Sequence, residues 1–328
     1  MNGRRISRRI AVGLVVLSCA SLCRSQTIGV YDALKITAER PRLEKKTNDL
    51  WNLMFERLLD KSENDALRRA RLEFPTLSSD GSLLNFQASA QQAVVQMPIH
   101  SLLLLEDICT AYAWLHQNGF SAITVNEYAS MLKYRQPNDF PGGAYPPPLK
   151  SLGIPEAALK DMEVDGLSLR FRNSAYAYVL AHEMGHILYR HPGNRAAPPD
   201  VSRSHERQAD EFALKVLQRD HQIPMGAILF FQMTAFVASP GRFEFSSVEA
   251  WQKAVHEATH PVTSERIRGF SDGLRRAAGQ YGENREVALD VAQKLTRIAE
   301  EMDDRDWQLY FQRIGQRAPL TSLQPRRQ

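Results

Sequence analysis

A short segment near the middle of the chain holds the residue types that bind a catalytic metal ion. His182 and His186 lie four positions apart in an HExxH pattern, His182-Glu183-Met184-Gly185-His186. On a helix this spacing places both imidazoles on one face, one turn apart, so both can reach the same ion. Glu183, next to the first histidine, can hold and deprotonate a metal-bound water. The pattern therefore indicates a zinc site that activates water.

A catalytic zinc ion needs a third protein ligand and one position open to water. The segment from Ser204 to Glu211 follows in the chain and offers two candidates. Glu206 is favoured, because Asp210 lies one turn further on the same face and can accept a hydrogen bond from a ligand histidine. His205 is the alternative, although it points away from that face. We expect one Zn²⁺ per chain, bound by Glu206 and the two histidines.

A second copy of the pattern, from His256 to His260, is a weaker candidate for a zinc site. Pro261 follows it immediately and ends the helix, so its second histidine lies at a helix terminus. We expect His260 to serve the main site instead, as the donor that stabilises the oxyanion of the reaction. A helix C-terminal cap is an equally good interpretation of this histidine. Tyr189 and Tyr178 are the alternative donors.

The apolar periodicity indicates which elements position these residues. The metal-binding pattern falls in a helix predicted over about 174–191, with His191 interpreted as a helix-end histidine rather than a ligand. Residues 137–155 hold six prolines and three glycines, which predicts a long irregular loop and suggests a lid over the cleft. The other predicted helices cover the periodic part of 42–73 and about 99–116, 203–219, 225–238, 247–259, 263–278 and 284–313; the predicted strands are 93–98 and 164–171.

These elements predict an α+β fold that is predominantly α, with a small sheet. The predicted units are a signal peptide over 1–25, an N-terminal helical region over 26–86, the metallopeptidase domain over 87–272, and a C-terminal helical region with a polar tail over 273–328.

The N-terminal 25 residues explain the net charge of +4. Arg4, Arg5, Arg8 and Arg9 precede a short apolar run and a small-residue exit at Ser25, the pattern of a secretory signal peptide. This segment holds five of the 41 basic residues and none of the 37 acidic ones, so the remainder has 36 basic against 37 acidic residues. Residues 26–328 therefore have no basic excess that would favour a nucleic-acid partner. We expect an exported, periplasmic or secreted protein; a lipoprotein or an uncleaved anchor is the less favoured alternative.

Cysteine content agrees with a fold that has no disulfide framework. Cleavage after Ser25 would leave Cys109 as the single cysteine. The exported chain would then rely on its apolar core and its bound metal for stability.

The region from about 176 to 270 resembles the gluzincin zinc metallopeptidases of the HtpX and CAAX-prenyl-protease type, which include soluble periplasmic members. Four ordered segments carry the resemblance: Leu180–His191, Glu206–Asp210, Ile223–Phe231 and Thr259–Ile267. It implies a zincin-like metalloprotease core with extra helices. It also implies His182 and His186 as ligands, Glu183 as general base, Glu206 as third ligand, and an approach of His260 to the active site. The membrane helices of the integral members are missing, and residues 26–165 are not explained by it.

The sequence thus predicts an exported zinc metalloendopeptidase that hydrolyses peptide bonds in protein or peptide substrates. Protein quality control in the cell envelope, with peripheral envelope association, is the role that the resemblance suggests. The alternative function is a non-catalytic interaction or chaperone-like module that keeps zinc for stability. A closed structural site would have little use for Glu183, so this residue favours catalysis. The oligomeric state and the physiological substrate do not follow from the sequence.

Overall fold

The computed structural model describes residues 27–193, 197–257 and 261–317. The predicted signal peptide and His260 therefore lie outside the described residues. The chain is mostly helical with a small sheet, which confirms the α+β, predominantly α class. No helix in the described part of the chain has the length and apolar character needed to cross a bilayer.

The N-terminal third contains both sheets. Strands β1 (Thr27–Ile28) and β2 (Tyr31–Asp32) form a short antiparallel pair that leads into helix α1 (Ala33–Leu53). A π-helical turn (Met54–Leu58) and helix α2 (Lys61–Leu67) follow. Strands β3 (Arg71–Glu73), β4 (Gln87–Ser89) and β5 (Val94–Gln96) form a sheet in the order β3-β5-β4, parallel between β3 and β5 and antiparallel between β5 and β4. β5 and helix α3 (Ile99–Gln117) confirm the strand and helix predicted there.

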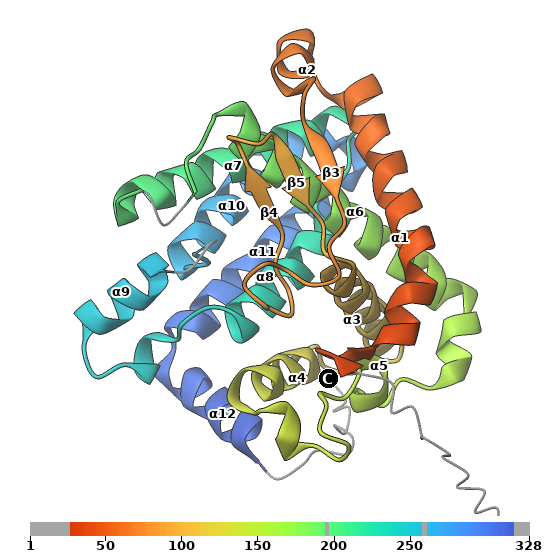
Figure 1. The fold of residues 1–328 in the computed structure, drawn as a ribbon, viewed down its shortest axis with the longest axis vertical. Coiled ribbons are helices and arrows are strands. Elements are labelled where there is room, and N and C mark those ends of the chain that lie inside the picture. The colour runs from red at the N-terminus through yellow and green to blue at the C-terminus, as the bar shows by residue number, and fades with distance from the viewer. Residues whose placement is uncertain (1–26, 194–196, 258–260, 318–328) are drawn as a thin grey trace, which may run out of the picture.

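Helix α6 (Met162–Leu188) is the central element of the fold. Every residue from 174 to 187 is buried, so this part of the helix is enclosed on all sides. It packs against α3, against α7 (Pro199–Arg219), against α8 (Met225–Val237) and against strand β4. In the view of Figure 1 the three-stranded sheet lies over α6, with α1 to one side and α7 to the other.

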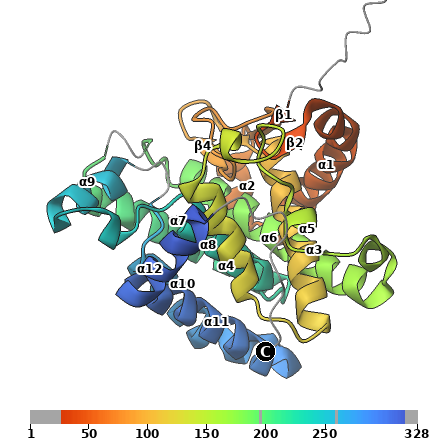
Figure 2. The same ribbon diagram turned by 90° about the horizontal axis from the view of Figure 1, so that it is seen from below.

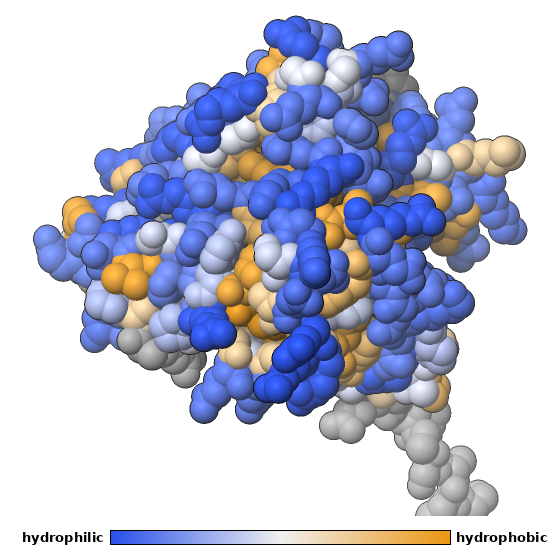
Figure 3. All heavy atoms as spheres, turned by 90° about the horizontal axis from the view of Figure 1, so that it is seen from above, coloured by the Kyte–Doolittle hydropathy of each residue, from blue (hydrophilic) through white to orange (hydrophobic). Residues whose placement is uncertain are grey.

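Helices α10 (Ser264–Ala277), α11 (Arg285–Asp303) and α12 (Arg305–Gln316) lie on the side of the molecule away from the two sheets (Figure 2). Helix α10 packs on α7 and on α11, and α12 packs on α4 (Ile123–Tyr134). Figure 2 shows these helices side by side, with α9 (Val248–Glu257) projecting at one end. The face seen in Figure 3 is mainly polar, with apolar residues visible between polar ones near its middle.

Two predicted elements are wrong. Residues 164–171 alternate like a strand, but they form the first turns of α6. The Asp161 side chain caps this helix by accepting hydrogen bonds from the backbone N–H groups of Glu163 and Val164. Val164 and Phe171 are then buried at helical spacing. The helix predicted over 284–313 is two helices, because Asp304 ends α11 and its side chain caps the start of α12.

The proline-rich loop is irregular, as predicted, apart from a 3-10 turn (Pro137–Asp139) and one turn of helix α5 (Pro148–Ser151). A further 3-10 helix (Glu156–Lys160) then leads to α6. Two tyrosines attach the loop to α4: Tyr128 donates to the carbonyl of Pro146, and Tyr145 donates to the carbonyl of Arg135. No residue of 137–155 lines the cleft at the HExxH pattern, so the structure does not support the lid hypothesis for this loop.

Close packing of α8 on α6 depends on Gly226. A Cβ atom at this position would lie 2.2 Å from the carbonyl oxygen of Phe171 and 2.4 Å from the backbone nitrogen of Ala175. The Gly226 N–H donates to the Ser174 hydroxyl at 2.7 Å, which fixes the contact. Since Phe171 and Ser174 precede the histidines on α6, this contact supports the helix that carries them.

We expect Gly226→Ala to destabilise the fold by about 1–3 kcal/mol, because the added methyl group must push the two helices apart. The measurement is the free energy of unfolding in urea. Gly166→Ala, on the same central helix, is the matched control. Nothing lies within 4 Å of its added Cβ, so helix propensity should make it about 0.5–1 kcal/mol more stable. Equal stability of the Gly226 variant and the wild type would contradict the close approach.

Candidate metal centre and cleft

Helices α6 and α7 bring three donor groups to one point. The Nε2 atoms of His182 and His186 are 3.2 Å apart, and the Glu206 carboxylate lies 3.4 Å from the first and 3.6 Å from the second. All three side chains are buried. Among the described residues, one group of three or more His, Cys, Asp or Glu side chains lies close enough together to hold a metal ion, and these three form it.

The spacing of these donors fits a tetrahedral ion. Zinc bonds of about 2.0–2.1 Å at tetrahedral angles place neighbouring donor atoms roughly 3.4 Å apart, and the two Nε2 atoms, 3.2 Å apart, lie close to that value. Each imidazole also faces one oxygen of Glu206, Oε2 at 3.4 Å for His182 and Oε1 at 3.6 Å for His186. The set of two imidazoles and one carboxylate also suits zinc. The group could therefore hold a metal ion, with His182, His186 and Glu206 as its ligands.

Gly185, between the two histidines, allows α7 to approach α6. A Cβ atom here would lie 3.0 Å from the Cα of Ala209 and 3.3 Å from the Phe212 ring. Ala209 is next to Asp210 and one turn from Glu206, so the missing side chain at Gly185 brings both carboxylates to the histidines.

Asp210 holds the second nitrogen of His182. The Nδ1 of His182 lies 2.8 Å from a carboxylate oxygen of Asp210, which also accepts a 2.7 Å hydrogen bond from the Tyr178 hydroxyl. Burial alone would lower the pKa of His182, but the Asp210 carboxylate outweighs it and raises this pKa to about 9. The surroundings therefore favour positive charge at the position where His182 faces Glu206.

Arg266, from α10, completes the site. Its guanidinium donates to both carboxylate oxygens of Asp210 at 2.8 and 2.9 Å, and it lies 2.6 Å from Glu206. The Thr263 side chain caps α10 by accepting from the Arg266 N–H, which sets the start of the helix one turn before this arginine. Although burial would raise the pKa of Asp210, Arg266 and then His182 lower it to about 2.

The formal charges of the site leave room for a divalent cation. Glu183, Glu206 and Asp210 are buried carboxylates, and the Arg266 side chain is only 6% exposed. With the histidines neutral, as binding to a metal ion requires, three negative charges and one positive charge leave a formal charge of −2. Buried charge is costly unless it is compensated, and one divalent ion would bring the sum to zero.

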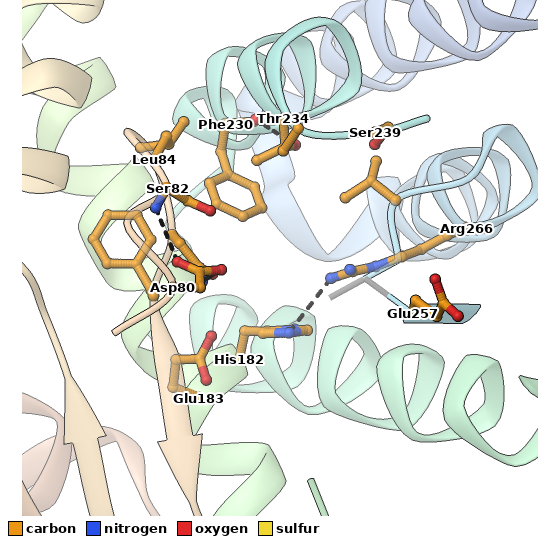
Figure 4. Close-up of a pocket in the computed structure, with 14 residues that line it drawn as sticks. Asp80, Ser82, Leu84, His182, Glu183, Phe230, Thr234, Ser239, Glu257 and Arg266 are labelled. Carbon is orange, nitrogen blue, oxygen red and sulfur yellow. Dashed lines mark hydrogen bonds between the residues drawn. The ribbon is translucent and has the colours of Figure 1, made fainter. Parts of the chain in front are cut away.

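Glu183 lies in a cleft next to this group. Figure 4 shows His182 and Glu183 at one wall, Asp80 and Ser82 facing them, and Arg266 on the far side. Beyond these residues the cleft is lined by side chains from the segment before β4, from α8 and from both sides of the α9–α10 connection: Leu84, Asn85, Phe86, Phe230, Thr234, Ala238, Ser239, Glu257 and Val262. The cavity has a volume of about 170 Å³.

The cleft wall formed by residues 80–86 is attached to the start of α3 by His100. The Leu83 carbonyl lies 3.0 Å from Nδ1 of His100, and the Val30 N–H donates to Nε2 at 3.0 Å. Since Nε2 accepts, the neutral ring carries its hydrogen on Nδ1 and donates it to Leu83. The Ser101 hydroxyl adds a contact by accepting from the Asn85 N–H.

We expect His100 to make folding stability depend on pH between 6.5 and 4. Burial lowers its pKa from 6.5 to about 4, so in this range the unfolded chain binds a proton that the folded chain does not. The contribution of His100 to the free energy of unfolding is therefore complete above pH 6.5. It falls by about 3 kcal/mol as pH drops to 4, at 1.36 kcal/mol per pKa unit. The measurement is urea unfolding across this range. His100→Gln keeps a donor and an acceptor but does not titrate; an unchanged pH profile in this variant would contradict the assignment.

None of the other candidate residues that the structure describes joins the donor group or lines the cleft. Tyr178 is fully buried and donates to Asp210, and Tyr189 does not line the cleft, so neither occupies the position of an oxyanion donor. His205 stacks on His191 rather than joining the ligand group. His260 cannot be placed, but Glu257 and Val262, on either side of it in the chain, both line the cleft.

Two side chains that contact the donor group or its partner Asp210 are not predicted from the sequence. Arg266 stood in a segment that carried the family resemblance, but it had no assigned role. His191 was interpreted as a helix-end residue, yet its Nδ1 lies 3.0 Å from Nδ1 of His186, and its own pKa is lowered by burial. The local signal for Arg266 was a threonine cap three residues before it. His191 had no such signal, because its contact depends on how the chain turns after α6.

Comparison with known proteins supports a peptidase. Residues 127–282 match the family model described as Peptidase U49. This region includes α6, α7, α8 and α10, and therefore every side chain of the candidate metal centre. No curated protein and no solved structure matches the chain. The match indicates a peptidase family, and with it a proteolytic function on protein or peptide substrates.

Proposed function

We propose that this protein is a zinc-dependent metalloendopeptidase with a zincin-like core. One Zn²⁺ is bound by His182, His186 and Glu206, and Glu183 is the general base. The observation that carries the proposal is the buried donor group, with separations of 3.2–3.6 Å, beside a carboxylate that opens into a cleft. The resemblance to gluzincins of the HtpX and CAAX-prenyl-protease type and the peptidase family match support the same reading.

Each side chain has a distinct part in the proposed reaction. A zinc ion in this site supplies Lewis acidity and lowers the pKa of bound water to about 7. Glu183 accepts the proton of the attacking water and returns it to the leaving amine. Asp210 keeps the hydrogen of His182 on Nδ1, so that Nε2 faces the ligand group. His260 remains our candidate for the donor that stabilises the oxyanion.

The cleft favours a substrate with an apolar side chain next to the cleaved bond. Leu84, Phe86, Phe230 and Val262 contribute apolar walls, and the cavity of about 170 Å³ is similar to one that holds a benzene molecule. Strand β4 is at the edge of its sheet and packs on α6, so it offers backbone groups to an extended peptide. Peptides with Leu or Phe beside the cleaved bond should be cut faster than those with Asp or Lys.

Export through a signal peptide over 1–25 and a role in envelope protein quality control complete the proposal. These rest on the N-terminal sequence and the resemblance alone. A non-catalytic zinc-stabilised module would need a closed site, whereas Glu183 opens into the cleft. A nucleic-acid partner has no support in the near-neutral charge of residues 26–328.

The deciding experiment combines metal analysis with a cleavage assay on the purified protein. We expect about one zinc per chain, and cleavage of casein that stops on removal of zinc with a chelator and returns when Zn²⁺ is added. Zinc-loaded protein that cleaves no casein or peptide would favour the non-catalytic alternative. Cleavage that persists in metal-free protein would refute the metal mechanism.

A further inference from the structure

The C-terminal end of α6 is an unusual helix stop. Tyr189 is the C-cap residue, and Arg190 takes the left-handed conformation with φ of 56°, where glycine is the usual residue. The His191 N–H donates to the His186 carbonyl at 2.9 Å, and the Arg190 N–H donates to the Ile187 carbonyl at 3.1 Å. This pair of bonds defines a Schellman motif. The side-chain contact that is normally apolar in this motif is here between His191 and His186.

The hydrogen bonds of His191 determine which nitrogen of His186 carries hydrogen. Nε2 of His191 lies 2.8 Å from the side-chain oxygen of Gln208, which can only accept, so the hydrogen is on Nε2. The neutral His191 ring then accepts at Nδ1, which is 3.0 Å from Nδ1 of His186. His186 must therefore donate from Nδ1, which leaves the lone pair on its Nε2 directed at His182 and Glu206.

Packing holds the His191 ring in this orientation. The ring stacks on His205, with centroids 4.1 Å apart and planes at 16°, and also on Tyr189 at 5.7 Å and 29°. The residue is 6% exposed. Gln208 and His205 lie on α7, the helix that also provides Glu206. The contacts of His191 therefore connect the end of α6 to α7 beside the donor group.

We propose that His191, held by Gln208, is a positioning residue that fixes the ring orientation and hydrogen position of His186 for metal binding. It has the part for His186 that Asp210 has for His182, but with a neutral partner in place of a carboxylate. The inference rests on the proposed function, since it assumes that His186 is a metal ligand. Outer partners of this kind contribute about 10- to 100-fold to metal affinity.

The test is the Zn²⁺ dissociation constant of the full chain, measured by competition with a chelating dye. His191→Phe keeps the stacking area but removes both ring nitrogens, and we expect its dissociation constant to rise about 10- to 100-fold. Gln208→Leu, which leaves His191 in place, should weaken binding in the same direction. His191→Gln, whose amide oxygen can still accept from His186, should retain more affinity than His191→Phe.

Arg190→Gly is the matched control. Glycine adopts the left-handed conformation without strain, so this variant should bind Zn²⁺ as the wild type does. A second readout is the nitrogen-15 NMR spectrum of His186 in the metal-free protein, which should show hydrogen on Nδ1 in the wild type and lose this signature in His191→Phe. Wild-type affinity and an unchanged His186 signature in both His191→Phe and Gln208→Leu would overturn the inference. Failure of the wild type to bind Zn²⁺ would refute the proposed function instead.

Discussion

Replacing Glu183 by glutamine is expected to lower the rate of peptide cleavage by about 10²- to 10⁴-fold while the zinc content stays at about one per chain. Glutamine has nearly the same shape as glutamate, but its amide cannot accept a proton from water. Glu183 does not belong to the three-residue donor group, so binding of the ion should not require its charge. Initial rates on a casein-type substrate, together with metal analysis of the same sample, measure both quantities.

The matched control for this prediction is Glu211→Gln. Glu211 is an exposed glutamate on α7 and does not line the cleft. Its loss should change neither the rate nor the zinc content. Zinc-loaded Glu183→Gln protein that cleaves at the wild-type rate would eliminate Glu183 as the general base.

Replacing Arg266 by methionine is expected to destabilise the fold by about 3–5 kcal/mol. The change removes the buried cation that contacts Asp210 and Glu206, and leaves both carboxylates buried without it. The free energy of unfolding in urea measures the effect. Zinc should be removed beforehand with a chelator, because a bound cation would offset part of the loss.

A double variant tests whether charge is the cause. Asp210→Asn removes one of the two carboxylates, so the Arg266→Met and Asp210→Asn changes together should cost less than the sum of the two single changes. Arg203→Met is the control for general loss of an arginine, since Arg203 is exposed on α7; its effect should stay within about 0.5 kcal/mol. An Arg266→Met effect as small as that of Arg203→Met would show that the buried ion pairs contribute little.

Helical periodicity alone predicted most of the elements, and its errors have local causes. The alternation of residues 164–171 resembled a strand because a helix buried on one side can also show apolar residues at short intervals. Asp161 favours the helix over the strand, since its side chain accepts hydrogen bonds from the first N–H groups of α6. Asp304 divides the last predicted helix in the same way.

Spacing within one helix or one segment was sufficient to predict the donor group. His182 and His186 share a face because they are four residues apart, and Glu206 and Asp210 share a face for the same reason. The structure brings the two faces together, and Gly185 is the residue that allows their approach.

Spacing along the chain is enough to predict the short-range features: the two histidines and Glu183 on one helix, Glu206 and Asp210 on another, and a basic excess confined to the first 25 residues. The surroundings of these residues follow from packing between distant segments. Arg266 is 56 residues from Asp210 in the chain, and the cleft wall at Asp80 is about a hundred residues before His182. His191 reaches His186 only through the left-handed turn at Arg190. Helix geometry fixes contacts over a few residues, whereas contacts at these separations depend on packing of the whole core.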